Sequence, residues 1–169
     1  FLSSPVLAGE DFALIDKDVS DVARKLSMIW NVYDFFAMYA NIDGWEPADG
    51  REKAFGAGAT SADGGKTEML EPEKLDNVLD KWIVSRIHML RDEIVEGMEA
   101  YNLPKATAGV LPFIDDLSNW FVRRSRRRFW KSDDTADKNE AYETLYYVML
   151  TLSKLIAPFV PFLSEELYH

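Results

Sequence analysis

The chain has 169 residues, no cysteine and a formal net charge of -10; the missing cysteines exclude disulfides and thiolate metal sites and fit a reducing, cytoplasmic setting. A hydrophobic content of 47% suffices for one domain with a real core, and no apolar run is long enough to cross a bilayer. The opening lacks a signal-peptide pattern and an initiator methionine, and the sequence stops at His169 inside a predicted helix. We therefore expect a piece of a larger protein.

The first predicted helix begins near Asp18 or Ser20, either of which can cap it, and runs to about Ala40. Its apolar residues recur at steps of three and four and predict one core-facing stripe, formed by Val22, Leu26, Ile29, Tyr33, Phe36 and Ala40. The following stretch is rich in glycine, alanine, aspartate and lysine and shows no periodicity. We predict a flexible surface insertion over about residues 44–70.

The rest of the chain predicts three more long helices and a short one. The second begins at Pro72 and runs to about Tyr101, and the third spans residues 105–130, with Pro112 expected to kink or split it near residue 111. The fourth spans residues 137–156, and Pro161 opens a short helix over residues 162–168. Long helices joined by mostly short connections predict an all-α, up-and-down helix bundle.

Residues for catalysis or metal binding are scarce. The sequence has no phosphate-binding glycine loop, no dinucleotide fingerprint and no zinc-protease motif. Its two histidines, His88 and His169, make a poor start on a metal site without cysteines, and we expect His88 to be a partly exposed structural residue. Asp115 and Asp116 are adjacent, so on a helix they do not face each other as an acid–base dyad would. We predict no catalytic residue, no metal site and no cofactor for this piece.

A basic strip is the strongest sign of a binding function. Arg123, Arg124, Arg126, Arg127 and Arg128 lie among aromatic side chains, in a chain that is strongly acidic as a whole. Guanidinium groups bind phosphates in bidentate fashion, and aromatic rings offer stacking surfaces for bases. The alternative is a solvated helix face whose arginines pair with local carboxylates.

The first predicted helix has a second face beside its core stripe. Residues at steps of mostly three and four lie along it, namely Arg24, Ser27, Met28, Asn31, Phe35 and Met38. A phenylalanine one turn after an asparagine suits base recognition, because the ring can stack while the amide reads a base edge. The alternative for Phe35 is that it widens the buried face. Trp30 and Trp120 are expected in or beside the core.

Several motifs resemble one family, and they occur in its order. Leu-Asp-Lys-Trp-Ile-Val-Ser-Arg-Ile at residues 79–87 resembles a motif in the anticodon-binding domain of class I aminoacyl-tRNA synthetases. Residues 115–120 and 123–130 resemble the isoleucyl-tRNA synthetases of the eukaryote-like type, as does Trp-Asn-Val-Tyr at residues 30–33. Residues 155–168 are similar to a closing motif shared by the isoleucine, valine and leucine enzymes. The resemblance covers the chain except for the insertion.

The resemblance implies a helical domain that binds the anticodon stem and loop of tRNA(Ile) in protein biosynthesis. It places Asn31 and Phe35 at anticodon bases, with Arg24, Lys25 and Trp30 in support, and assigns the basic strip to tRNA phosphates or to the surface facing another domain. The catalytic and C-terminal domains of the full-length enzyme would be further partners, and residues 1–17 a tail of the preceding region. The HIGH and KMSKS signatures are missing, so the piece alone is expected to be inactive.

For the full-length enzyme the resemblance implies ATP and allows a zinc ion, and neither is expected to be bound by this piece. Two alternatives stay open. The domain can belong to a valine or leucine enzyme instead, or the chain can be a helical protein-interaction module that binds no RNA.

Overall fold

A computed structural model describes residues 16–47, 70–130 and 135–168, and all regular structure within them is helical. The long helices are α1 (Asp16–Asp43), α3 (Val78–Glu99) and α7 (Thr135–Ile156). Between α3 and α7 the chain forms α4 (Leu103–Ala108), α5 (Val110–Asp115), a π-helical segment (Asp116–Val122) and α6 (Arg123–Trp130), and α8 (Pro161–Tyr168) ends the described part. Within these residues, no helix is long and apolar enough to cross a membrane.

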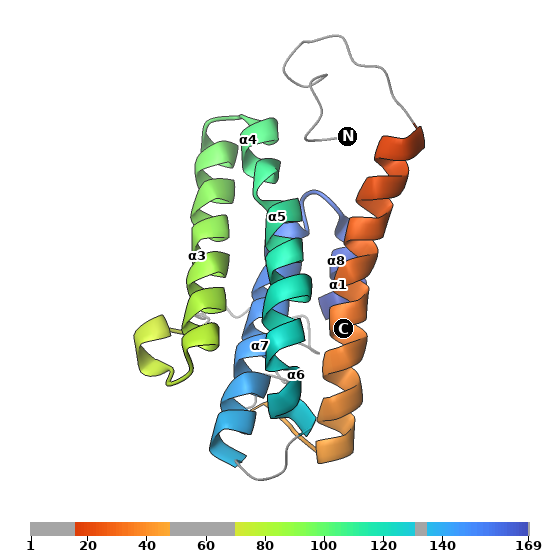
Figure 1. Ribbon diagram of the computed structural model, residues 1–169. Helices are drawn as coiled ribbons and strands as arrows, with labels where there is room; N and C mark the ends of the chain where they lie inside the picture. The colour runs from red at the N-terminus through yellow and green to blue at the C-terminus, as the bar shows by residue number, and fades with distance from the viewer. Residues whose placement is uncertain (1–15, 48–69, 131–134, 169) are drawn as a thin grey trace, which may run out of the picture.

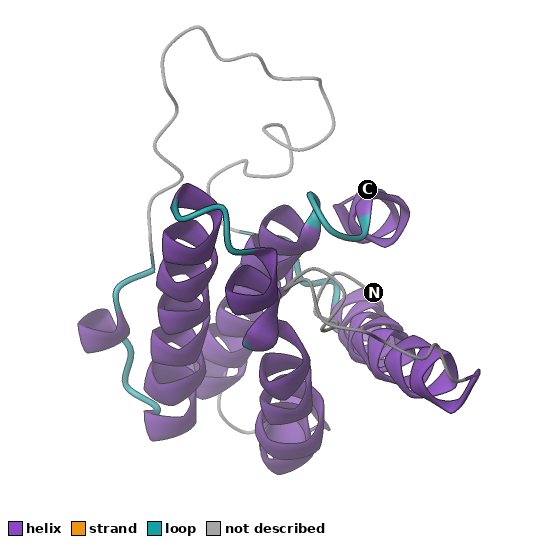
Figure 2. Cartoon of the chain, turned by 90° about the horizontal axis from the view of Figure 1, so that it is seen from above, coloured by secondary structure: helices purple, strands orange, loops and turns teal. Residues whose placement is uncertain are grey.

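The elements form a bundle in which α1, α3, the rod from α5 to α6, and α7 run alternately down and up (Figure 1). Viewed from above, α1 slants away from the other helices at its N-terminal end (Figure 2). The core contains fully buried side chains from each of these helices, including Ile29, Ile83, Ile87, Phe113, Leu117, Phe121, Phe129, Tyr142, Leu145, Leu152 and Ile156. The predicted all-α, up-and-down bundle is confirmed.

The predicted start of the second helix at Pro72 is wrong. Pro72 begins only a single 3-10 turn, Pro72–Lys74, and buried Leu75 follows it in an extended conformation. The helix begins at Val78 because Asn77 caps it, its side-chain oxygen accepting a hydrogen bond from the Leu79 N–H at 2.9 Å. The carboxylate of Glu140 on α7 also accepts bonds from the N–H groups of the residues just before the helix.

The third predicted helix is split close to the expected position near residue 111. The break lies at Gly109, between α4 and α5, and Pro112 falls in the first turn of α5. Pro112 has no N–H to bond the C=O of Ala108, four residues earlier, so one helix cannot run through this point. A Cβ atom on Gly109 would lie 2.4 Å from a carboxylate oxygen of Glu93 and 2.9 Å from Leu90, so the glycine also leaves room for these side chains of α3.

The π-helical segment follows from a four-residue repeat of inward-facing side chains. Phe113, Leu117, Phe121, Ser125 and Phe129 are all buried. In an ideal α-helix, residues four apart drift by roughly 40° around the axis at each step, so this series would leave the core. The wider turns of a π-helix reduce that drift. The segment Asp116–Val122 therefore keeps one face of the rod on the core, and it also sets the phase of α6.

Some predictions fall outside the described residues. They include the tail at 1–17 except for its last two residues, and most of the insertion at 44–70. The other helix ends agree with the structure to within a few residues: α1 extends from Asp16 to Asp43, and α8 begins at Pro161.

Candidate nucleic-acid interface

Helix α6 has two faces, and its arginines divide between them. Ser125 and Phe129 are buried against the core. Four arginines of the predicted strip are exposed on the outer side, namely Arg123, Arg124, Arg126 and Arg127. The outer face of α6, as we call these four residues, lies at the end of the bundle where the C-terminal part of α1 ends (Figure 1).

The outer face of α6 carries four positive charges. Among the described residues, no carboxylate lies within ion-pair distance of any of its four arginines. Arg123 and Arg127 are four residues apart, a spacing at which like charges destabilise a helix by about 0.2–0.5 kcal/mol. An anion bound to this face would relieve that repulsion.

Phe35 joins α1 to this face. Its ring is partly buried and meets the ring of Phe129 edge-on, with centroids 5.1 Å apart, and it also contacts Tyr39 at 5.0 Å. The guanidinium carbon of Arg126 lies 5.7 Å from the centroid of the Phe35 ring, within cation–π range. Phe35 is thus neither a free platform nor a core residue: one side packs on the core and the other lies beside an unpaired arginine.

The other predicted residues of α1 are spread along the helix. Asn31 is exposed one turn before Phe35, and Trp30, expected in or beside the core, is 37% exposed with its ring 5.3 Å from that of Tyr33. Arg24 is exposed and pairs with nearby Asp21. Lys25 forms an ion pair with Asp115 of α5. Phe35 therefore lies beside α6, Asn31 one turn before it, and Arg24 and Lys25 about two turns closer to the start of α1 than Asn31.

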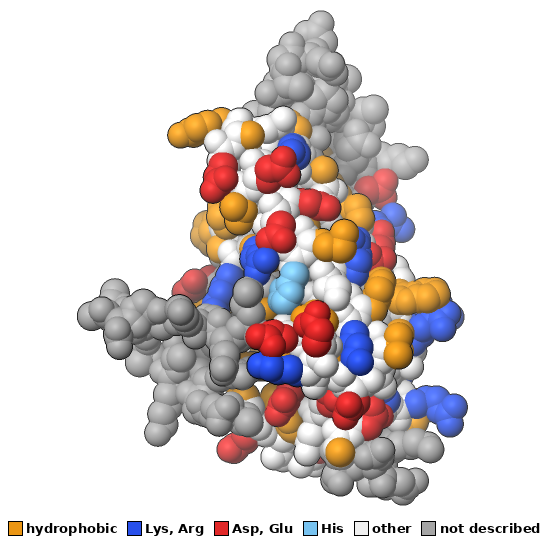
Figure 3. Space-filling model, turned by 90° about the vertical axis from the view of Figure 1, so that its left-hand side faces the viewer, with side chains coloured by type: hydrophobic (Ala, Val, Ile, Leu, Met, Phe, Trp, Pro, Cys, Tyr) orange, Lys and Arg blue, Asp and Glu red, His pale blue; other side chains and the backbone are white. Residues whose placement is uncertain are grey.

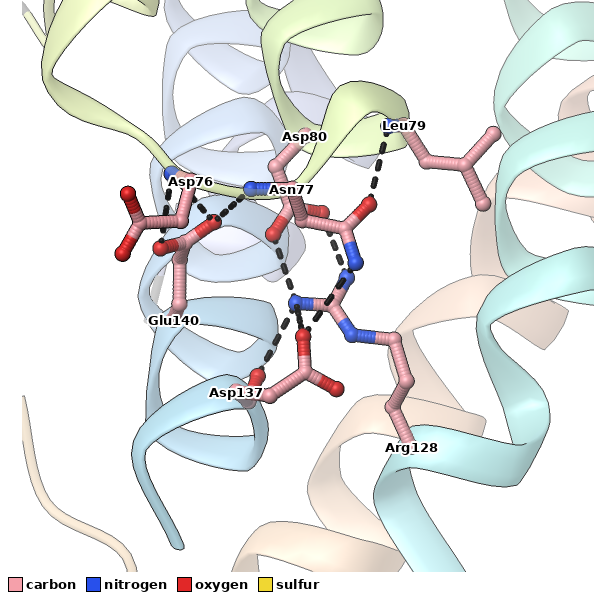
Figure 4. Close-up of polar contacts among 7 residues, drawn as sticks. All are labelled: Asp76, Asn77, Leu79, Asp80, Arg128, Asp137 and Glu140. Atoms are coloured by element: carbon pink, nitrogen blue, oxygen red, sulfur yellow. Dashed lines mark hydrogen bonds and ion pairs between the residues drawn. The ribbon is translucent and has the colours of Figure 1, made fainter. Parts of the chain in front are cut away.

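Arg128 belongs to the interior and not to the exposed strip. Its side chain is 10% exposed and binds the fully buried Asp80 of α3 through two hydrogen bonds of 2.7 Å (Figure 4). It also contacts the carboxylate of Asp137 on α7 at 2.7 Å. The prediction that Arg128 contacts tRNA or another domain is therefore corrected: the phase of α6 turns this side chain inward, where it ties three helices together.

Burial and hydrogen bonding act in opposite directions on the pKa values of this cluster. Desolvation raises the pKa of Asp80 to about 6, although the hydrogen bonds from Arg128 act to lower it. Burial alone would lower the pKa of Arg128, but its bonds to Asp80 and Asp137 outweigh that effect and raise it. Burial also acts to raise the pKa of Glu140, but the backbone N–H groups of Asn77 and Asp76 outweigh it and lower the pKa. The ion pair is formed at neutral pH.

The residues considered for catalysis have structural partners. Asp115 pairs with Lys25 of α1, while Asp116 accepts two bonds from Arg86 of α3, so the two carboxylates point to different helices, as predicted. His88 is partly buried and shares a 2.9 Å hydrogen bond with the Tyr147 hydroxyl. No group of three or more potential ligands for a metal ion occurs in the described part of the chain.

Sequence reasoning missed Trp120. It was expected in or beside the core, but it is 46% exposed on the π-helical segment, and Arg124 stacks on its ring with the guanidinium carbon 3.7 Å from the centroid. The four-residue spacing of Trp120 and Arg124, parallel to the buried four-residue repeat, was the available signal. By contrast, the side of the bundle formed by α3 mixes acidic and basic side chains without gathering either sign (Figure 3).

The described residues form an antiparallel helical bundle with exposed arginines and aromatic rings at one end, an arrangement suited to bind a polyanion. The family comparison makes this specific. Residues 80–169 match the family model described as the anticodon-binding domain of tRNA ligase, and the chain belongs to this family.

Individual relatives agree with the family. The chain is 41% identical over 153 residues to an isoleucine–tRNA ligase of Clostridium acetobutylicum, covering 90% of this chain and 13% of the relative. It is 44% identical over 154 residues to the isoleucine–tRNA ligase of Dehalococcoides mccartyi strain CBDB1, with the same coverage of 90% and 13%. The enzyme of Protochlamydia amoebophila is 36% identical over 168 residues, which are 99% of this chain and 14% of the relative. The chain thus spans about an eighth of the length of these relatives.

Proposed function

We propose that the chain is the anticodon-binding domain of an isoleucine–tRNA ligase and that it binds the anticodon stem and loop of tRNA(Ile). Asn31 and Phe35 contact unpaired anticodon bases, and Arg123, Arg124, Arg126 and Arg127 hold phosphates. The whole enzyme attaches isoleucine to tRNA(Ile) with ATP in the cytoplasm, and this domain supplies recognition without chemistry.

The observation that carries the proposal is the position of Phe35 beside Arg126. An aromatic ring with an unpaired guanidinium over it, one turn from an exposed amide, offers stacking, charge and base-edge hydrogen bonding at one place. Single-stranded loops are the usual targets of sequence-specific RNA recognition, because their bases are free to stack on side chains. The identity of the relatives supports isoleucine over valine or leucine.

The test is a titration of the 169-residue chain with a labelled anticodon stem–loop of tRNA(Ile), followed by fluorescence anisotropy and by NMR shift mapping. We expect the largest shifts at Asn31, Phe35 and the outer face of α6. The stem–loops of valine and leucine tRNAs should bind more weakly. If no RNA binds, the chain acts as a protein-interaction module instead, and if the valine or leucine stem–loop binds more tightly, the amino acid is misassigned.

A further inference from the structure

The π-helical segment and α6 have two flanks, and only one of them faces the proposed base site. On the α1 flank, Asp115 pairs with Lys25 and Arg126 lies over Phe35. On the other flank, Asp116 accepts two hydrogen bonds from Arg86 of α3. The line on which Asp116 lies continues at four-residue steps through Trp120 to Arg124, away from Phe35.

We propose that Trp120 and Arg124 form a second stacking platform, which takes an unpaired nucleotide of the bound RNA. The proposal rests on the proposed function and adds to it a site on the opposite flank of α6. Within the described residues the platform has no acidic partner: Trp120 is 46% exposed, and no carboxylate there pairs with Arg124.

The chemistry of the pair favours a nucleotide. The guanidinium of Arg124 lies 3.7 Å from the centroid of the indole ring, so the two groups form a layered surface on which a base can stack. Arg123 and Arg127 are exposed on neighbouring turns of the same helix and can hold the flanking phosphates. On this flank, Asp116 is already paired with Arg86, so its charge does not oppose an RNA strand there.

The π-helical segment is what aligns the two side chains. In an ideal α-helix Trp120 and Arg124 would be offset around the axis by roughly 40°. The wider turns before α6 reduce that offset while keeping Phe121 and Ser125 buried. The same backbone feature that preserves the core thus builds the outward-facing pair.

The experiment measures binding of the labelled anticodon stem–loop to the full chain and to Trp120→Ala. We expect a loss of about tenfold, since stacking on an aromatic side chain contributes that order of affinity per base. The matched control is Phe162→Ala, which removes an aromatic ring that is 88% exposed on α8 and should leave the affinity unchanged. Arg124→Lys keeps the charge but not the planar group, and it should weaken binding severalfold without changing the salt dependence.

A second readout does not depend on truncating the ring. Bound RNA should protect Trp120 from acrylamide quenching. The wild type should therefore gain more protection on RNA binding than Trp120→Phe, which lacks this indole. If Trp120→Ala and Arg124→Lys bind as the wild type does, or if RNA protects no fluorescence assigned to Trp120, the platform is refuted while Phe35→Ala still tests the first site. Failure of the wild type to bind any stem–loop refutes both.

Discussion

Arginine side chains have opposite roles on the inner and the outer face of α6. Arg128, on the inner face, gives both ends of its guanidinium to buried or half-buried carboxylates at 2.7 Å. Arg126, two residues earlier, meets an aromatic ring and no described carboxylate. The difference teaches that a run of arginines is not one binding motif: the phase of the helix decides which of them hold the fold and which remain for a ligand.

The largest effect on stability is expected when Arg128, the arginine of the inner face, is replaced. Arg128→Met leaves Asp80 buried without its partner, and removing one member of a buried pair costs about 3–5 kcal/mol. We expect urea denaturation at neutral pH to show a loss of that size in the free energy of unfolding. A loss below about 1 kcal/mol would contradict the structural role of Arg128. The double variant Asp80→Asn with Arg128→Met is the control, and it should recover part of the stability.

Phe35 lies between the two faces, so its replacement should weaken RNA binding and also lower the stability of the fold. Phe35→Ala removes a stacking surface and the edge contact with Phe129. We expect RNA binding to weaken about tenfold and the free energy of unfolding to fall by about 1–2 kcal/mol, less than for a fully buried phenylalanine. Anisotropy titrations and urea denaturation of the same samples measure the two losses. Loss of stability with unchanged affinity would make Phe35 a core residue only.

The contribution of Asp80, which pairs with Arg128 on the inner face of α6, to the free energy of unfolding should depend on pH. The pKa of Asp80 is raised to about 6 in the folded chain, above its unfolded value of about 3.8. The stability that this group contributes is therefore fully present below its unfolded pKa and is lost as pH rises through 6. The wild type should gain about 1 kcal/mol relative to Asp80→Asn when the pH falls from 7 to 5. Unfolding measurements on both proteins at the two pH values test this. The opposite sign would show that the bonds from Arg128 outweigh burial and lower the pKa of Asp80 below its unfolded value.

The smallest effect is expected for Arg24. It is exposed and pairs only with exposed Asp21, so Arg24→Ala should change the free energy of unfolding by less than about 0.5 kcal/mol. If this arginine supports the anticodon as predicted, RNA binding should still weaken a few-fold and lose some salt dependence. Unchanged binding would confine the interface to Asn31, Phe35 and α6.

The helices were predictable because their apolar residues recur at helical steps, as at Ile29, Ile83 and Ile87. The split near Pro112 was predictable too, because proline cannot continue a helix. The start of α3 was not, since it depends in part on the backbone N–H bonds that Glu140 of α7 accepts, a tertiary effect that local preference does not contain. The sequence also held a signal that was not used: Asp80 lies in the core stripe just before Ile83, so it needed a buried cation.

The candidate site was predicted in part. Helical spacing along one face predicted that Asn31 and Phe35 lie one turn apart, and they do so on α1, with Phe35 beside α6. The sequence did not reveal which arginines of α6 face the core and which face outward, because a run of identical residues does not indicate how the helix is rotated about its axis. Their phase is set by the buried four-residue repeat and by the π-helical segment before them.

The most direct test of the outer face is the salt dependence of RNA binding. Each arginine that neutralises a phosphate should contribute about 0.7–0.9 to the slope of the logarithm of affinity against the logarithm of salt concentration. Arg126→Ala should therefore lower the slope by about that amount. Lys105→Ala, which removes an equal charge near α4 at the other end of the bundle, should leave it unchanged. Equal slopes for the wild type and Arg126→Ala would contradict a phosphate-binding role for this face.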